Sequence, residues 1–254
     1  MKFPKIKKSI GYGVLGLVGV LGVILIISAT QKNSSKRCKG LQINIANNTE
    51  QYLVTKDDIE KTITRFGNEP VEGKIIENID LSKIEKRVLE SGYAKKCEAY
   101  TNLQGQLVVD IEPYKPIARV LDGYNHEDYY LDEDGEFFPT SKHFSQTVMI
   151  LNGDFFRKTK NLKSEKNKEL LEFIKYLTED EFWEAQITQV NINANREINL
   201  IPLLGQQIIE FGKVNKYQSK LNKLMVFYEK ILPEKEWSQF SKISLKYDSQ
   251  IVCN

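Results

Sequence analysis

The residues with the most reactive side chains are few and scattered along the chain. They are two histidines, His126 and His143, and three cysteines, Cys38, Cys97 and Cys253. A structural zinc site needs about four closely spaced ligands, and a disulfide framework needs an even set of cysteines. The spacing fits neither, so we expect no metal site, no cofactor and no disulfide framework. Two buried or unpaired thiols are the favoured interpretation, and a single Cys97 to Cys253 bridge stays open.

An acidic run, Asp132-Glu133-Asp134, precedes Gly135 and has the composition of a calcium loop. An EF-hand needs a glutamate at the twelfth position, and His143 stands there instead. The run is therefore interpreted as a solvated turn. The sequence also lacks GxSxG, HExxH, P-loop and GxGxxG patterns. An exported hydrolase is the least favoured of the functions considered, because no nucleophile and base are recognisable.

The composition of the 254 residues, with 41% apolar and 28% charged, is that of a folded protein and not of a disordered tail. The net charge of +2 hides an asymmetry, because residues 1–40 hold eight basic and no acidic residues. Residues 41–254 hold 28 basic against 34 acidic residues. The near-neutral total argues against a protein that wraps nucleic acid. The basic residues of the first 40 positions flank an apolar stretch.

That apolar stretch runs for 20 residues from Ile10 to Ala29 without a charge, which is long enough for a helix that crosses a bilayer. We predict a cytoplasmic tail at residues 1–9, a transmembrane helix at 10–30 and a linker at 31–40. A cleaved signal peptide is the alternative, but its apolar region is normally about 7 to 15 residues long. Because long domains are exported largely regardless of nearby charge, residues 31–254 are expected outside the cytoplasm.

Residues 41–113 are expected to form a first folded domain. Leu41, Ile43 and Ile45 alternate with polar or small residues and predict a strand. Thr55 and Asp80 are suited to cap two amphipathic helices. Two further strands, at residues 93–101 and 106–111, complete a strand-helix-helix-strand-strand order.

Residues 114–254 are expected to form a second domain rich in strands. Strands are predicted at residues 116–120, 129–131, 136–138, 148–151, 187–192, 198–203, 207–211 and 243–252. Helices are predicted at residues 164–178 and 214–231, and residues 179–185 either extend the first helix or form a separate turn. Because nothing follows the last strand to cover its backbone, that strand is a candidate open edge of the sheet.

Three segments of the second domain and its junction carry a family resemblance. They read VVDIEPYKPIARV at residues 108–120, YYLDEDGEFFPTS at 129–141 and VMILNG at 148–153. In order and content they resemble the FtsQ/DivIB family of cell-division proteins. The resemblance implies an α+β fold with a single transmembrane helix. A POTRA-like β-α-α-β-β module would follow it, and then a β-rich domain with one open sheet edge and packed helices.

The resemblance further implies a non-catalytic scaffold of the bacterial division machinery. Such a protein sits in the plasma (inner) membrane at the division site and docks other division proteins of the FtsB/FtsL type. Residues 243–252, ISLKYDSQIV, are similar to the family's last strand, with Lys246-Tyr247 where an Arg-Tyr pair is common. The expected partner-binding residues are Ile243, Leu245, Lys246, Tyr247, Ile251 and Val252.

Among these residues, Tyr247 is the strongest candidate, because a large ring with a polar tip suits an interface. Lys246 is placed for an acidic partner. For Ile243 and Leu245 the alternative is that they close the core. The alternative function is a POTRA-containing outer-membrane assembly or transport component, because POTRA-like modules also occur in such proteins.

Overall fold

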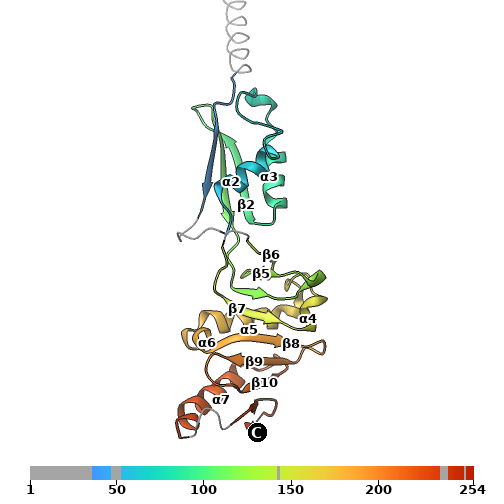
Figure 1. Cartoon of the computed structure of the whole chain (residues 1–254), viewed down its shortest axis with the longest axis vertical. Helices are drawn as coiled ribbons and strands as arrows, with labels where there is room; N and C mark the ends of the chain where they lie inside the picture. The colour runs from blue at the N-terminus through green and yellow to red at the C-terminus, as the bar shows by residue number, and fades with distance from the viewer. Residues whose placement is uncertain (1–35, 47–52, 142–143, 235–239, 249) are drawn as a thin grey trace, which may run out of the picture. The chain divides into compact units, whose positions relative to one another are not determined.

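The computed structural model describes residues 36–46, 53–141, 144–234, 240–248 and 250–254 (Figure 1). The predicted transmembrane helix at residues 10–30 lies outside these residues, and none of the helices within them is long and apolar enough to cross a membrane. The chain divides into two compact units. Unit 1 comprises the residues up to Ala46 together with Thr55–Glu112, and unit 2 comprises Asn47–Val54 and Pro113–Asn254.

Unit 1 has the predicted strand-helix-helix-strand-strand order, with one short 3₁₀ helix added. Its elements are β1 (Leu41–Ile45), α2 (Lys56–Thr64), η1 (Ile76–Asn78), α3 (Leu81–Glu90), β2 (Ala94–Thr101) and β3 (Leu107–Pro113). The strands form a sheet of order β1-β3-β2, in which β1 and β3 are parallel. Figure 1 shows α2 and α3 on one side of this sheet, where Ile59, Ile63, Ile84 and Val88 are buried.

The two helices of unit 1 begin where the sequence predicts. Thr55 and Asp58 form a capping box, in which the Asp58 N–H donates to Thr55 Oγ1 at 3.2 Å and the Thr55 N–H donates to Asp58 Oδ2 at 3.0 Å. The Lys83 N–H donates to Asp80 Oδ1 at 3.0 Å. These local bonds satisfy amides that a helix start leaves without partners.

Unit 2 contains short strands interleaved with helices. The first half consists of β4 (Ala118–Val120), η2 (Tyr124–His126), β5 (Tyr129–Leu131), β6 (Phe137–Pro139), β7 (Met149–Asn152), α4 (Asp154–Arg157), α5 (Glu165–Glu179) and α6 (Glu181–Gln186). The second half consists of β8 (Ile187–Ile192), β9 (Ile198–Pro202), β10 (Ile208–Gly212), α7 (Tyr217–Lys230), η3 (Leu232–Glu234), β11 (Lys242–Ser244) and β12 (Val252–Cys253).

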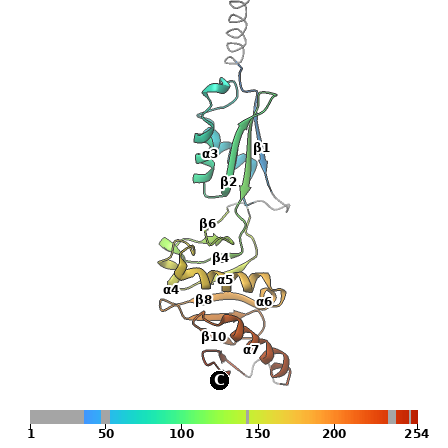
Figure 2. The ribbon, with the colours of Figure 1, turned by 180° about the vertical axis from the view of Figure 1, so that it is seen from behind.

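The strands of unit 2 lie in one sheet of order β12-β11-β10-β9-β8-β7-β4-β5-β6, as far as the described residues show. Figure 2 shows α5 and α7 in front of this sheet, on one face. Their apolar residues and those of the strands make one core, which includes Phe173, Leu177, Val190, Leu200, Phe211, Leu221, Leu224 and Phe227. The sheet is therefore covered along its centre by two amphipathic helices.

The structure decides one alternative in unit 2 and adds one helix that was not predicted. Of the two alternatives for residues 179–185, it shows a separate element, α6, because α5 ends at Glu179 and Asp180 Oδ1 accepts the N–H groups of Phe182 and Trp183, both at 3.1 Å. The short α4 was not expected. It follows Gly153 at φ +109°, where an added Cβ would lie 2.3 Å from the Ile192 carbonyl oxygen, so only glycine fits this step.

Candidate protein-docking edge

The side chains that could carry enzyme chemistry are dispersed in the described part of the chain. Cys38, Cys97 and Cys253 are free, and no group of three histidine, cysteine or carboxylate side chains among the described residues could hold a metal ion. Asp132 is buried, so the expectation of a solvated turn is wrong for this residue. Its Oδ1 accepts the N–H groups of Asp134 and Glu136 and stabilises the β5–β6 turn.

The C-terminal segment is a hairpin and not the single strand that residues 243–252 predicted. β11 pairs in parallel with β10 and antiparallel with β12. Lys242 and Asn254 exchange both backbone hydrogen bonds, at 3.2 and 3.0 Å. The chain therefore reverses direction between Leu245 and Ile251, and β12 occupies the outermost place in the sheet.

Among the described residues of β12, Cys253 is the one whose backbone groups are directed away from β11. In an antiparallel pair, residues that exchange hydrogen bonds alternate with residues whose backbone groups point away. Lys242 and Asn254 are a bonded pair, and Ile243 and Cys253 come next in the register. The N–H and C=O of Cys253 therefore point out of the sheet, where an added strand would meet them.

The structure separates the six predicted partner-binding residues into two groups. Ile243 and Leu245 are fully buried in the core of unit 2, so their side chains close the core and do not face a partner. Ile251 is half-buried and packs against the same core. Lys246, Tyr247 and Val252 are exposed, with Tyr247 at 53% and Val252 at 36%. We call Lys246, Tyr247 and the β12 backbone the docking edge.

The loop that presents Tyr247 is held in place by its main chain and by α7. The Leu245 N–H donates to the Glu210 carbonyl at 2.9 Å. The Lys223 ammonium donates to the carbonyls of Tyr247 at 2.6 Å and Asp248 at 3.1 Å. These contacts use backbone atoms. They therefore hold the loop in place and leave the Tyr247 ring exposed to solvent.

A buried lysine, Lys220, fixes the end of β10 behind this loop. Its ammonium donates to the carbonyls of Phe211 at 3.1 Å and Lys213 at 2.7 Å. Burial lowers the pKa of Lys220, and the neighbouring Lys223 lowers it further. Sequence reasoning missed this residue, because a lysine on an amphipathic helix is ordinarily placed in solvent.

Glu210 on β10 sets the charge of the docking edge. Its carboxylate lies 3.1 Å from Lys242 Nζ and 3.9 Å from Lys246 Nζ, so two lysines share one carboxylate. The hydrogen bond from Lys242 is the main cause that lowers the pKa of Glu210, and the charge of Lys246 adds to it while burial opposes it. The sequence did not reveal Glu210, since it lies far from both lysines along the chain.

This ion pairing predicts a pH-dependent contribution to stability. The lowered pKa means that pairing of Glu210 stabilises the fold above the ordinary value of 4.5, and that the gain disappears as the pH falls through the lowered pKa. We expect Glu210→Gln to cost at most about 1 kcal/mol of unfolding free energy at pH 7, with a difference from the wild type that shrinks at acid pH. Urea unfolding at several pH values measures it. A cost that stays constant down to pH 3 would contradict the assignment.

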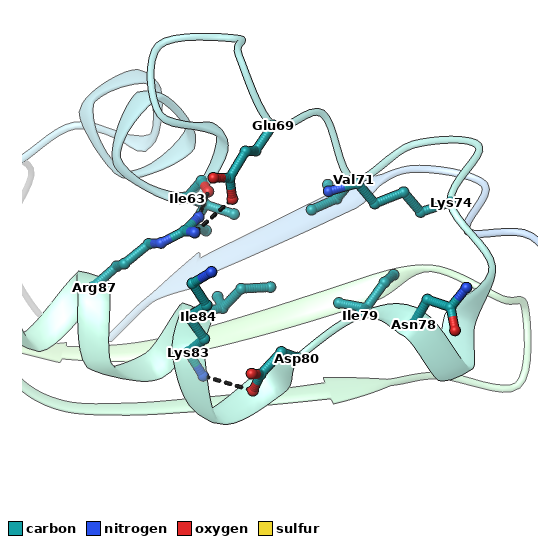
Figure 3. Close-up of a pocket in the computed structure, with 10 residues that line it drawn as sticks. All are labelled: Ile63, Glu69, Val71, Lys74, Asn78, Ile79, Asp80, Lys83, Ile84 and Arg87. Carbon is teal, nitrogen blue, oxygen red and sulfur yellow. Dashed lines mark hydrogen bonds and ion pairs between the residues drawn. The ribbon is translucent and has the colours of Figure 1, made fainter.

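Unit 1 offers a small hollow of about 130 Å³ between its two helices and the loop before α3 (Figure 3). Apolar side chains form part of its wall, and Lys74, Lys83 and Arg87 bring positive charge to it. The Arg87 guanidinium donates to the Ile63 carbonyl at 2.9 Å and to the Glu69 carboxylate. Arg87 thus ties α3 to the end of α2, and we assign it a structural role.

Comparison with known protein families adds to this geometry. Residues 36–112 match the model of a POTRA-like domain, and residues 115–254 match the model described as FtsQ/DivIB, C-terminal related. The chain belongs to the FtsQ/DivIB family. A search of curated proteins found no matching sequence.

Membership of the FtsQ/DivIB family gives the general role of the chain. The family consists of non-enzymatic cell-division proteins, and its domains indicate a scaffold role in division with other division proteins as partners. The expected POTRA-like domain is confirmed, and the β-rich α+β architecture agrees with the structure.

Proposed function

We propose that the chain is a single-pass protein of the bacterial plasma (inner) membrane that captures FtsB/FtsL-type division proteins at the docking edge. The observation that supports this most strongly is the outermost position of β12, with the backbone of Cys253 directed out of the sheet. A partner strand added there would gain main-chain hydrogen bonds, and alternate side chains would give it selectivity.

The proposed anchor is residues 10–30, with the amino terminus in the cytoplasm and the two units outside. It is supported by the 20 uncharged residues from Ile10 to Ala29, which match the thickness of a bilayer. This placement puts the docking edge in the compartment that contains the extracytoplasmic parts of other single-pass division proteins.

The experiment that tests this function is affinity purification of the full-length chain from its native membranes, with co-purifying proteins identified by mass. Small single-pass proteins with coiled-coil segments, co-localised at the division site, are the expected result. Recovery of outer-membrane assembly proteins in their place would support the alternative role as an assembly or transport component. The docking edge itself is tested by substitutions in it.

Charge reversal at Lys246 tests the expectation of an acidic partner. The Lys246 ammonium shares the single Glu210 carboxylate with Lys242 and lies 3.9 Å from it, so this carboxylate does not neutralise both lysines. We expect Lys246→Glu to slow association roughly three- to tenfold at low salt, with the difference disappearing at high salt. Lys168→Glu, at an exposed position of α5, is the matched control. Association kinetics that are unchanged by Lys246→Glu, or equally changed by the control, would rule out electrostatic steering at this position.

A further inference from the structure

Three segments of unit 1 meet at the end where its described chain begins. The Cys38 N–H donates to the Lys74 carbonyl, the Gly73 N–H donates to the Cys38 carbonyl, and the Lys39 N–H donates to the Gly105 carbonyl, each at 2.8 Å. Residues 36–39, the loop around Gly73 and the β2–β3 turn therefore form one surface, which we call the entry end of unit 1. Figures 1 and 2 show α3 running away from this end.

Leu103 stands at the tip of the β2–β3 turn, and its exposed fraction is 103%. The turn is well fixed, because the Asn102 N–H donates to the Gln106 carbonyl and the Gly105 N–H donates to the Asn102 carbonyl, both at 3.0 Å. The Gln106 N–H also donates to Asn102 Oδ1 at 2.9 Å. A rigid turn thus holds a large apolar side chain in water, where polar residues are the usual choice.

Exposed basic residues gather at the entry end, which also carries Leu103. Lys36, Arg37, Lys39 and Lys74 are all exposed there, and Glu72 and Glu77 are two exposed acidic residues of the same loop region. The side chain of Lys39 lies alongside Gly105, within the turn that carries Leu103. The Arg37 guanidinium donates to the Gly73 carbonyl at 2.7 Å. Basic groups around an exposed apolar tip match the two layers of an anionic membrane surface, the phosphate headgroups and the acyl boundary.

We propose that the entry end of unit 1 lies against an anionic lipid bilayer, with Leu103 in the acyl boundary and the basic residues on the headgroups. This inference rests on the proposed anchor at residues 10–30. Five residues connect residue 30 to Lys36, and an extended chain spans at most about 3.6 Å per residue. The entry end therefore stays within about 20 Å of the membrane surface, and no other part of unit 1 is tethered as closely.

The test uses the full-length chain with Leu103→Trp, reconstituted into vesicles that contain phosphatidylglycerol and bromine-labelled acyl chains. The spectrum of the wild type, which has two tryptophans, is subtracted. We expect at least about a twofold quenching of the added tryptophan, because a residue in the acyl boundary lies close to the bromine atoms. Leu89→Trp is the matched control, since Leu89 is 42% exposed and lies toward the far end of α3. Its emission should not change.

Lipid charge is the second variable, because the proposal requires headgroup phosphates. Quenching at position 103 should fall in vesicles of phosphatidylcholine alone and at high salt. Equal quenching in neutral vesicles would overturn the proposal as stated. Protection of the introduced tryptophan only after a purified partner is added would also overturn it and would assign Leu103 to a protein interface.

Flotation of the vesicles after an alkaline wash separates this inference from the proposed anchor. A chain that floats with the vesicles but shows no quenching at position 103 overturns the inference alone. A chain that the wash removes from the vesicles overturns the anchor and the inference together. Partner capture at Tyr247 is measured independently of both.

Discussion

Replacing Tyr247 with alanine should weaken capture of the division partner about thirtyfold and leave the melting temperature unchanged. An exposed tyrosine that becomes buried in an interface commonly contributes about 2 kcal/mol to binding. The loop around Tyr247 is held by the Lys223 ammonium, which donates to the Tyr247 carbonyl, and by the Leu245 N–H, which donates to the Glu210 carbonyl, so loss of the ring does not release it. The affinity loss would therefore report the contact of the ring and not a rearrangement of the loop.

This prediction is measured with the full-length chain in nanodiscs and a purified FtsB/FtsL-type pair. Tyr100→Ala is the matched control, because Tyr100 is also a tyrosine, is 41% exposed and lies on β2 of unit 1. Equal binding by the Tyr247 variant and the wild type would show that the ring lies outside the interface. Equal losses in both tyrosine variants would point to a different docking surface.

A proline at position 253 should have a still larger effect, a loss of about a hundredfold in affinity. Proline removes the outward N–H of Cys253, and the partner's carbonyl would then be buried without a donor at a cost of about 1–3 kcal/mol. The bonds inside the hairpin come from Lys242 with Asn254 and from the Ser244 and Val252 pair, so they are retained. Proline is tolerated on an edge strand where the N–H that it lacks would point away from the sheet.

Cys253→Ala separates the backbone from the thiol at the same position. It keeps the N–H and should bind within about twofold of the wild type, because edge pairing depends on main-chain groups. Amide exchange of Lys242 reports whether the hairpin is intact in both variants, since its N–H donates to the Asn254 carbonyl across the hairpin. If the proline variant binds normally with an intact hairpin, strand addition at β12 is wrong.

Point substitutions are better tests of this edge than removal of residues 241–254. That deletion would also remove Ile243 and Leu245, which are fully buried in the core of unit 2. Loss of two such side chains commonly costs several kcal/mol. A deleted chain that failed to bind would therefore say nothing about the docking edge.

Unit 1 could be predicted almost completely from the sequence, because its signals are local. The capping box of Thr55 and Asp58 and the cap at Asp80 define the helix starts within four residues of chain. The alternation of Leu41, Ile43 and Ile45 describes a strand with one face on the core. Each of these features depends on neighbours in the sequence, where pattern and propensity are informative.

The sequence narrowed the docking edge to residues 243–252 but did not show which of these residues face outward. Ile243, Leu245 and Tyr247 alternate as a strand does, yet the chain leaves the sheet after Ser244 and returns as β12. What decides this path is distant in sequence. The Leu245 N–H bonds to Glu210 on β10, and Lys223 on α7 holds Tyr247. Periodicity contains no information about such contacts, so it left open whether Ile243 and Leu245 close the core or line the edge.

The parallel pairing of β10 with β11 determines the order in which the last strands can join the sheet during synthesis. A parallel partner cannot follow through a tight turn, so α7 and η3 must be synthesised before β11 can join the sheet, and β12 is added after β11. Domains fold during synthesis from the amino-terminal side. The docking edge is therefore formed only once β12 has been synthesised, and a chain that is interrupted before β12 lacks it.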